Sequence, residues 1–191
     1  MIKAIIFDNF GVLYKNSAAL AYERLAGDDR SKWEEYIGIF RANDLGLITK
    51  AEWDQQIADL FGITAEEWDT TITSLDGKNI ALLDQVVELR KNYKTALLSN
   101  LGPGRIDDYY TAEEQAKYFD VVVGSGDLGI AKPDAQIYEY TAKQLGLQPE
   151  ECVFTDDSMV NVDGAKEAGM EALYFDDTPT FLKELKVLLE T

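Results

Sequence analysis

Residues 4–12 read AIIFDNFGV, so that an apolar run ends at Asp8 and Gly11 follows shortly after it. Short apolar runs of the same kind recur at 95–98, 121–123, 153–155 and 172–175. Segments with helical spacing separate most of them, at 80–91, 134–145, 160–168 and 181–189. Short runs that are apolar throughout are typical of strands buried on both faces. The alternation of strand and helix therefore predicts a doubly wound, Rossmann-like α/β fold with a parallel sheet.

Residues 16–77 interrupt this alternation, because they contain helical stretches and no convincing strand. Residues 49–52 (TKAE) and 64–67 (TAEE) both have the pattern of a capping box, and Gly62 suits a helix end between them. All three tryptophans, Trp33, Trp53 and Trp68, fall in this segment, where we expect them to pack helices together. The segment is therefore predicted to be an all-helical insertion.

These patterns predict two structural units. The α/β core is expected to comprise residues 1–14 and 80–191, and the helical insertion residues 15–79. The apolar run that begins the chain meets Asp8 long before it reaches the length of a signal peptide or a membrane span. We therefore expect a cytoplasmic protein.

The charge and the residue content exclude several classes of function. The chain of 191 residues has 18 Lys and Arg against 35 Asp and Glu, a net charge of −17. An acidic surface disfavours nucleic acid and anionic membranes as partners. The sequence contains no histidine, and Cys152 is its one cysteine. Histidine-based triads and cysteine zinc sites are therefore impossible, and carboxylates become the natural catalytic and metal-binding groups.

Polar residues follow the predicted strands where each one ends. Asp8 follows the first strand, Ser99 and Asn100 the second, Lys132 the third, and the pair Asp156-Asp157 the fourth. Each alone is an ordinary turn or capping residue. The carboxyl ends of parallel strands meet at one edge of a sheet, where ligands bind. Together these residues predict a site for Mg²⁺ and a phosphoryl group, with Asp8 placed to attack phosphorus.

Four segments in this order resemble the motifs of the haloacid dehalogenase-like (HAD) hydrolases. They are AIIFDNFGV at 4–12, LLSN at 97–100, KPDAQIY at 132–138 and FTDDSMVNVDGAKEAGM at 154–170. The helical insertion after the first motif resembles the cap of their subfamily I. The resemblance covers nearly the whole chain and implies a Mg²⁺-dependent phosphatase of a small phosphorylated metabolite.

The resemblance also implies a role for each matching residue. Asp8 would be the nucleophile that forms an aspartyl phosphate, and Lys132 would steady it together with the phosphate. Ser99, with Asn100 beside it, would hold a phosphoryl oxygen. The implied magnesium ligands are Asp8, the backbone carbonyl of Phe10, Asp156 and Asp157.

Phe10 departs from the phosphatase pattern. Phosphatases of this family normally have a second aspartate at this position, which protonates the leaving group and then activates water. Phenylalanine cannot transfer a proton, and the loss of a general acid and base typically lowers the rate by about 10²- to 10⁴-fold. Unless another side chain supplies the proton, we expect activity to be best on aryl phosphates, whose leaving groups need little protonation.

Phe10 also leaves two alternative functions open. The 2-haloacid dehalogenases have an aromatic residue at this position, need no metal and use an arginine of the cap. Arg41 is a possible counterpart of that arginine. In a phosphatase, Arg41 would instead be a candidate contact for a substrate anion. A noncatalytic protein that binds metal and phosphate is the second alternative. Receiver domains use similar residues, but in a different order and without a helical insertion. The oligomeric state stays open.

Overall fold

The computed structural model describes residues 1–190 and has a parallel five-stranded sheet at its centre. The strand order is β3-β2-β1-β4-β5. The strands are β1 (Ala4–Phe7), β2 (Lys94–Ser99), β3 (Val121–Gly124), β4 (Cys152–Asp156) and β5 (Glu171–Tyr174). The predicted α/β fold class is confirmed, and all five strands occur where short apolar runs predicted them.

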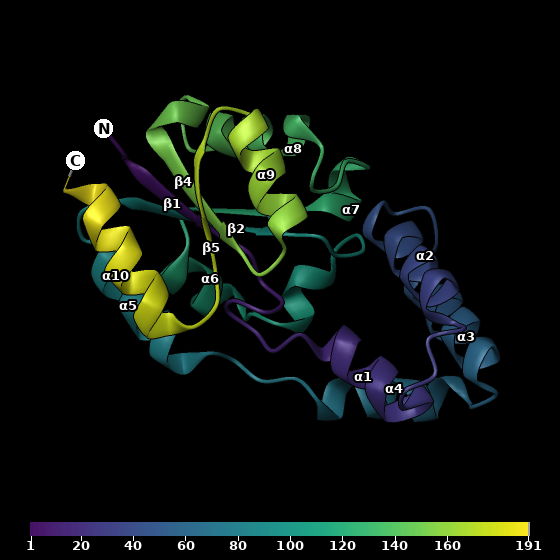
Figure 1. Cartoon of the computed structure of the whole chain (residues 1–191). Helices are drawn as coiled ribbons and strands as arrows, with labels where there is room; N and C mark the ends of the chain where they lie inside the picture. Colours follow the sequence, from purple (N-terminus) through teal and green to yellow (C-terminus); the bar gives the residue numbers. More distant parts are fainter. Residues whose placement is uncertain (191) are drawn as a thin grey trace.

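Helices cover both faces of the sheet, as Figure 1 shows. The covering helices are α5 (Ile80–Leu89), α6 (Ala112–Tyr118), α7 (Ser125–Leu128), α8 (Ala135–Gln144), α9 (Met159–Glu167) and α10 (Thr178–Leu189). Two 3₁₀ turns, η1 (Arg105–Asp108) and η2 (Pro149–Glu151), lie in the connections. Along β1 the side chains alternate: Ile5 and Phe7 pack against α5 and α10, whereas Ala4 and Ile6 pack against α8 and α9. Burial on both faces explains why the strands are apolar throughout.

Several boundaries differ from the sequence-based expectation, and two of them have a clear physical reason. β5 ends at Tyr174, and Phe175 lies beyond it, where its ring packs against Phe181 of α10 with the centroids 5.8 Å apart. The helix predicted to begin at Phe181 begins at Thr178, because the Asp177 side chain caps it by accepting a hydrogen bond from the Thr180 amide.

The insertion after β1 contains four helices, which lie beside the sheet in Figure 1. They are α1 (Ser17–Ala26), α2 (Trp33–Asp44), α3 (Lys50–Phe61) and α4 (Ala65–Ser74), and we call residues 17–74 the helical unit. Both predicted capping boxes are present, at Thr49 and Thr64, and Gly62 has the left-handed conformation of a helix end. The division of the chain into two units at residues 15 and 79 stays a prediction.

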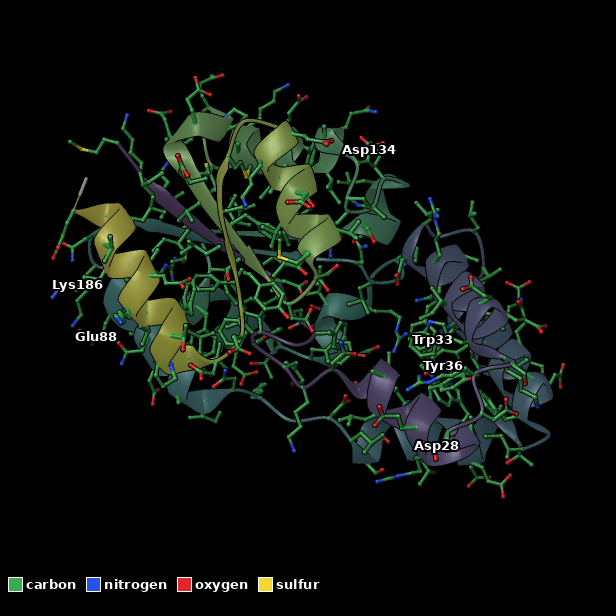
Figure 2. The ribbon with its side chains drawn as sticks, in the orientation of Figure 1. Asp28, Trp33, Tyr36, Glu88, Asp134 and Lys186 are labelled. Carbon is green, nitrogen blue, oxygen red and sulfur yellow. The ribbon has the colours of Figure 1, made fainter. Side chains whose placement is uncertain are left out.

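The helical unit has an apolar core of its own. Trp53, Trp68, Tyr22 and Tyr36 are buried there. Figure 2 shows Trp33 and Tyr36 among the helices of this unit, and their ring centroids lie 6.0 Å apart. The tryptophans therefore pack helices together, as the sequence predicts. Within residues 1–190, no helix has the length and apolar character that crossing a membrane would require.

Candidate active site

The register of the three central strands brings their polar ends together. Phe7 lies between Leu97 of β2 and Thr155 of β4. The next residue, Asp8, continues the pairing, because its amide donates to the Thr155 carbonyl at 2.9 Å. Ser99 at the end of β2 and Asp156 at the end of β4 are fully buried at the same edge of the sheet. The sheet therefore places a nucleophile candidate between a hydroxyl and a second carboxylate.

Lys132 links the two central carboxylates. Its ammonium group forms an ion pair with Asp8 Oδ1 and another with Asp156 Oδ2, the latter at 2.7 Å. The Lys132 side chain is only 1% exposed. Two hydrogen bonds hold its backbone: Asn100 Nδ2 donates to the Lys132 carbonyl at 3.0 Å, and the Lys132 amide donates to Asn100 Oδ1 at 2.9 Å. The side chain of Asn100, expected to contact substrate, thus holds Lys132 in position.

Three carboxylates form a cluster suited to a divalent cation. One oxygen from each of Asp8, Asp156 and Asp157 lies within 4.8 Å of the others. Burial and the neighbouring Asp156 raise the pKa of Asp8 to about 8, against the lowering effect of Lys132. Three acidic groups with one ammonium leave an excess of negative charge in a buried place. A hard divalent cation such as Mg²⁺ would balance this charge, so the donor set fits that ion.

The two C-terminal carboxylates of the cluster are held differently. Asp156 accepts hydrogen bonds from the Ser158 amide at 2.8 Å and from Asn161 Nδ2 at 3.0 and 3.1 Å. Asp157 accepts one from Asn16 Nδ2 at 3.2 Å, at the start of α1. Asn161 also lines the cavity described below. Asp157 is therefore less tied to the protein than Asp156 and freer to bind a cation.

Ser99 offers a donor for an anion. Within the described part of the chain, its buried Oγ is among the few side-chain atoms with no hydrogen-bond partner. An unpaired buried hydroxyl costs free energy unless a ligand pairs with it. Ser99 ends β2, the neighbour of β1 in the sheet, so its hydroxyl lies at the same strand edge as Asp8 and fits the binding of a phosphoryl oxygen.

The conformation of Gly11 makes room for Asp157. Gly11 has a φ of +94°, and a β carbon there would lie 2.0 Å from Asp157 Oδ2. We expect Gly11→Ala to displace this carboxylate and to weaken Mg²⁺ binding by about tenfold or more, as measured by calorimetry. Gly27→Ala is the matched control, because Gly27 also has a positive φ of +59° but nothing within 4 Å of its β-carbon position. A Mg²⁺ affinity of Gly11→Ala equal to that of the control would contradict this role.

The Phe10 side chain belongs to an aromatic cluster. Its ring packs edge-on against Tyr109 at 5.0 Å and lies 6.5 Å from the ring of Tyr14. Tyr109 follows the Gly102-Pro103-Gly104 loop, and its segment gave no catalytic signal in the sequence. Phe10 therefore contributes an apolar wall to the site, and the metal contact expected of its carbonyl stays a prediction.

A cavity of about 1020 Å³ lies between the helical unit and the sheet edge. Its core side is lined by Phe10, Asn100 and Lys132, and its opposite side by Arg41, Asp44 and Trp53 of the helical unit. Arg41 thus lies across the cavity from the strand ends rather than among them. Arg105 of η1, which the sequence did not single out, also lines the cavity. Its guanidinium lies 5.0 Å from the Trp53 ring centroid, and its Nε donates to Asp108 at 3.0 Å.

Comparison with known proteins points to one family. Residues 2–169 match the family model described as haloacid dehalogenase-like hydrolase. The chain is also similar to D-ribitol-5-phosphate phosphatase of Bacteroides thetaiotaomicron. The two are 30% identical over 206 residues, and the match covers 100% of each.

Solved structures agree with these sequence matches. A HAD family enzyme of Bacteroides thetaiotaomicron, in complex with magnesium and inorganic phosphate, superposes with a TM-score of 0.74 at 25% identity. The match covers 93% of this chain and 97% of that one. A HAD-like hydrolase of Porphyromonas gingivalis gives a TM-score of 0.79 at 22% identity, covering 100% and 99% of the two chains, and supports the fold.

Proposed function

Because the chain belongs to the haloacid dehalogenase-like hydrolases, we propose that it is a Mg²⁺-dependent phosphatase of a small phosphorylated metabolite. The observation that carries this proposal is the group around Asp8. A carboxylate nucleophile, a buried lysine, an unpaired hydroxyl and two further carboxylates meet at one strand edge. These are the groups that phosphoryl transfer through an aspartyl phosphate requires.

Each residue has a distinct task in this proposal. The ammonium group of Lys132 orients the Asp8 carboxylate toward phosphorus and offsets the charge of the phosphate. Ser99 Oγ donates to a phosphoryl oxygen. Asp157 and Asp8 would hold Mg²⁺. Asp156 would bind the ion either directly or through a water molecule. When bound, Mg²⁺ neutralises carboxylate and phosphate charge and so favours approach of the two anions.

The helical unit is proposed to act as a cap that selects the substrate. It forms one wall of the cavity, so that substrate would be enclosed between the helices and the strand ends. Arg41 of this wall and Arg105 of η1 in the core both place positive charge in the cavity lining. D-ribitol 5-phosphate, the substrate in the name of the full-length relative, is the first metabolite to test.

The acidic cluster favours this function over the dehalogenase alternative. Three carboxylates that converge within 4.8 Å have a clear use in holding a cation. The dehalogenases, by the resemblance considered above, need no metal. Phe10 still leaves the noncatalytic alternative in place, and activity measurements separate all three functions.

Steady-state assays of p-nitrophenyl phosphate and of 2-chloropropionate test the proposal. We expect steady release of p-nitrophenol that requires Mg²⁺ and stops when the metal is chelated, and no release of chloride. A single equivalent of p-nitrophenol followed by a stall would indicate a phosphoacceptor that does not turn over. Chloride release without metal, and no phosphate hydrolysis, would overturn the proposal in favour of dehalogenation.

A further inference from the structure

The site around Asp8 lacks an obvious proton donor for the leaving group. Phe10 has no acidic proton, and the Lys132 ammonium is already paired with two carboxylates. Three other acidic side chains of the described residues line the cavity: Tyr109, Asp134 and Asp44. Burial raises the pKa of Tyr109 to about 12, too high for efficient proton transfer at neutral pH.

Asp134 is committed to a structural task. It is the residue before α8, and its Oδ1 accepts a hydrogen bond from the Gln136 amide at 2.9 Å. Asp134 is also exposed, so its carboxyl group is in contact with water. This leaves Asp44, the last residue of α2, as the carboxyl group that faces the cavity without a capping role.

Three contacts fix the end of α2 against the core. Ser125 Oγ donates a hydrogen bond to the Asp44 carbonyl. Gly46 approaches so closely that a β carbon there would lie 2.8 Å from the Gly126 carbonyl oxygen. Asn43 Oδ1 lies 2.5 Å from the position that a β carbon on Gly102 would occupy. Asp44 is therefore held at a defined place in the cavity wall, although it belongs to the helical unit.

The surroundings of Asp44 suit a proton donor. Burial raises its pKa to about 7, while Asn43, Lys132 and Arg105 act in the opposite direction. The charges of Lys132 and Arg105 are close enough to act on this carboxyl group across the cavity. A carboxyl group whose pKa lies near the working pH is efficient both as an acid and as a base.

We propose that Asp44, supplied by the helical unit, is the general acid and base that the core lacks at Phe10. The inference rests on the proposed phosphatase function and names the residue that completes it. It also predicts the class of substrate: phosphate esters of ordinary alcohols, whose leaving groups need a proton, should be hydrolysed well.

The proton and electron balance of the two steps is complete. In the first step an Asp8 carboxylate oxygen bonds to phosphorus, the ester P–O bond breaks, and its electron pair stays on the leaving oxygen. That oxygen takes the proton of Asp44 and departs as an alcohol. In the second step Asp44, now a carboxylate, removes a proton from water. The water oxygen bonds to phosphorus, Asp8 leaves as a carboxylate, and the products are phosphate and protonated Asp44.

The other charged groups around Asp44 are few. From the core, Lys132 and Asp134 follow β3, Arg105 and Tyr109 follow β2, and Asp127 lies on α7, which packs against α2. On α2 itself the neighbour is Arg41, and α3 contributes the uncharged Trp53. Of these, Lys132 has its pKa raised by the carboxylates of Asp156 and Asp8, and Tyr109 has its pKa raised to about 12 by burial, so neither titrates near neutral pH. Asp8, with its pKa raised to about 8, must lose its proton to attack phosphorus, so its titration would make activity rise with pH. A decline in activity as pH rises above about 7 would therefore report the loss of the proton from Asp44.

The test compares Asp44→Asn with wild type on two esters, p-nitrophenyl phosphate and D-ribitol 5-phosphate, both with Mg²⁺. We expect kcat on the alkyl ester to fall by about 10²- to 10⁴-fold, and kcat on the aryl ester by less than about tenfold. In wild type, kcat/KM for the alkyl ester should decline as pH rises above about 7, and this decline should be absent in the variant. Asp28→Asn is the matched control, because Asp28 also belongs to the helical unit but is exposed and does not line the cavity.

The kinetics of Asp44→Asn test the role of Asp44, whereas the wild-type activity on the aryl ester tests the phosphatase function. A rise in KM alone, or an equal loss of kcat on both esters, would show that Asp44 binds substrate or supports the structure and would overturn the inference. Far-UV circular dichroism of the variant identifies a loss caused by misfolding, and Asp44→Glu should then restore alkyl-ester activity in part. Absence of Mg²⁺-dependent hydrolysis of the aryl ester by wild type would instead refute the phosphatase function.

Discussion

Replacing Asp8 by asparagine is expected to lower Mg²⁺-dependent hydrolysis of p-nitrophenyl phosphate by about 10⁴-fold or more. Asparagine has nearly the same shape as aspartate, but its amide does not attack phosphorus. Asp8 follows β1, the strand between β2 and β4, and its carboxylate pairs with Lys132, so it holds the central position at the strand edge. The steady-state rate of p-nitrophenol release measures the effect.

The stability of the same variant provides the control. The Asp8 carboxylate is buried and its pKa is raised to about 8, so its ionised form is disfavoured in the folded protein. Lys132 keeps its ion pair with Asp156 in this variant, so the removal of the disfavoured charge should not lower the melting temperature in Mg²⁺-free buffer. A variant that melts like wild type and is inactive supports the role of Asp8 as nucleophile. Retention of more than about a tenth of the wild-type rate in such a variant would contradict it.

Lys132→Met is expected to have the largest effect on stability. The ammonium group lies between Asp8 and Asp156, and its removal leaves two buried carboxylates facing each other. Breaking a buried ion pair in this way typically costs about 3 to 5 kcal/mol of the free energy of unfolding. Urea unfolding at pH 7.5 in Mg²⁺-free buffer measures this loss.

The loss of folding stability in Lys132→Met should depend on pH and on the magnesium concentration. Without the lysine, burial and Asp156 raise the pKa of Asp8 unopposed, so protonation relieves the repulsion at low pH. The loss of stability should therefore be smaller at pH 5 than at pH 8. Added Mg²⁺ should stabilise the variant more than it stabilises wild type, provided that it binds only the folded chain.

Lys91→Met is the matched control for this prediction. Lys91 pairs with Glu88 at 2.6 Å, but both side chains are about 60% exposed. An exposed pair contributes about 1 kcal/mol or less, so this variant should be nearly as stable as wild type. If Lys132→Met lowers the free energy of unfolding no more than Lys91→Met does, the stabilising role of Lys132 between Asp8 and Asp156 would be contradicted.

The sequence predicted the parts of the fold that local patterns determine. Runs such as 4–7 are apolar because both faces of the sheet are covered, and this pattern is visible without any structure. The capping boxes at Thr49 and Thr64 depend on neighbours three residues apart, and both are present. The predicted position of β5 was wrong by one residue. Phe175 is apolar because it packs against Phe181 of α10, and not because it belongs to the strand.

Contacts between the two parts of the chain were beyond sequence reasoning. Asp44 is the last residue of α2, and an acidic residue at such a position does not indicate a function. Only its position across the cavity from Lys132 distinguishes it. The same holds for Arg105, whose guanidinium lies over Trp53 of the helical unit. Asn100 was placed correctly beside Ser99, but its bonds to the Lys132 backbone depend on a loop that lies 32 residues further along the chain.

Locating the phosphoryl group on the protein during turnover tests the nucleophilic role of Asp8. Wild type turning over p-nitrophenyl phosphate with Mg²⁺ is quenched with acid, digested and analysed by mass spectrometry. A phosphoryl group is expected on Asp8, present with Mg²⁺ and absent when the metal is chelated. A phosphoryl group on a different residue, with Asp8 unmodified during turnover, would contradict this role.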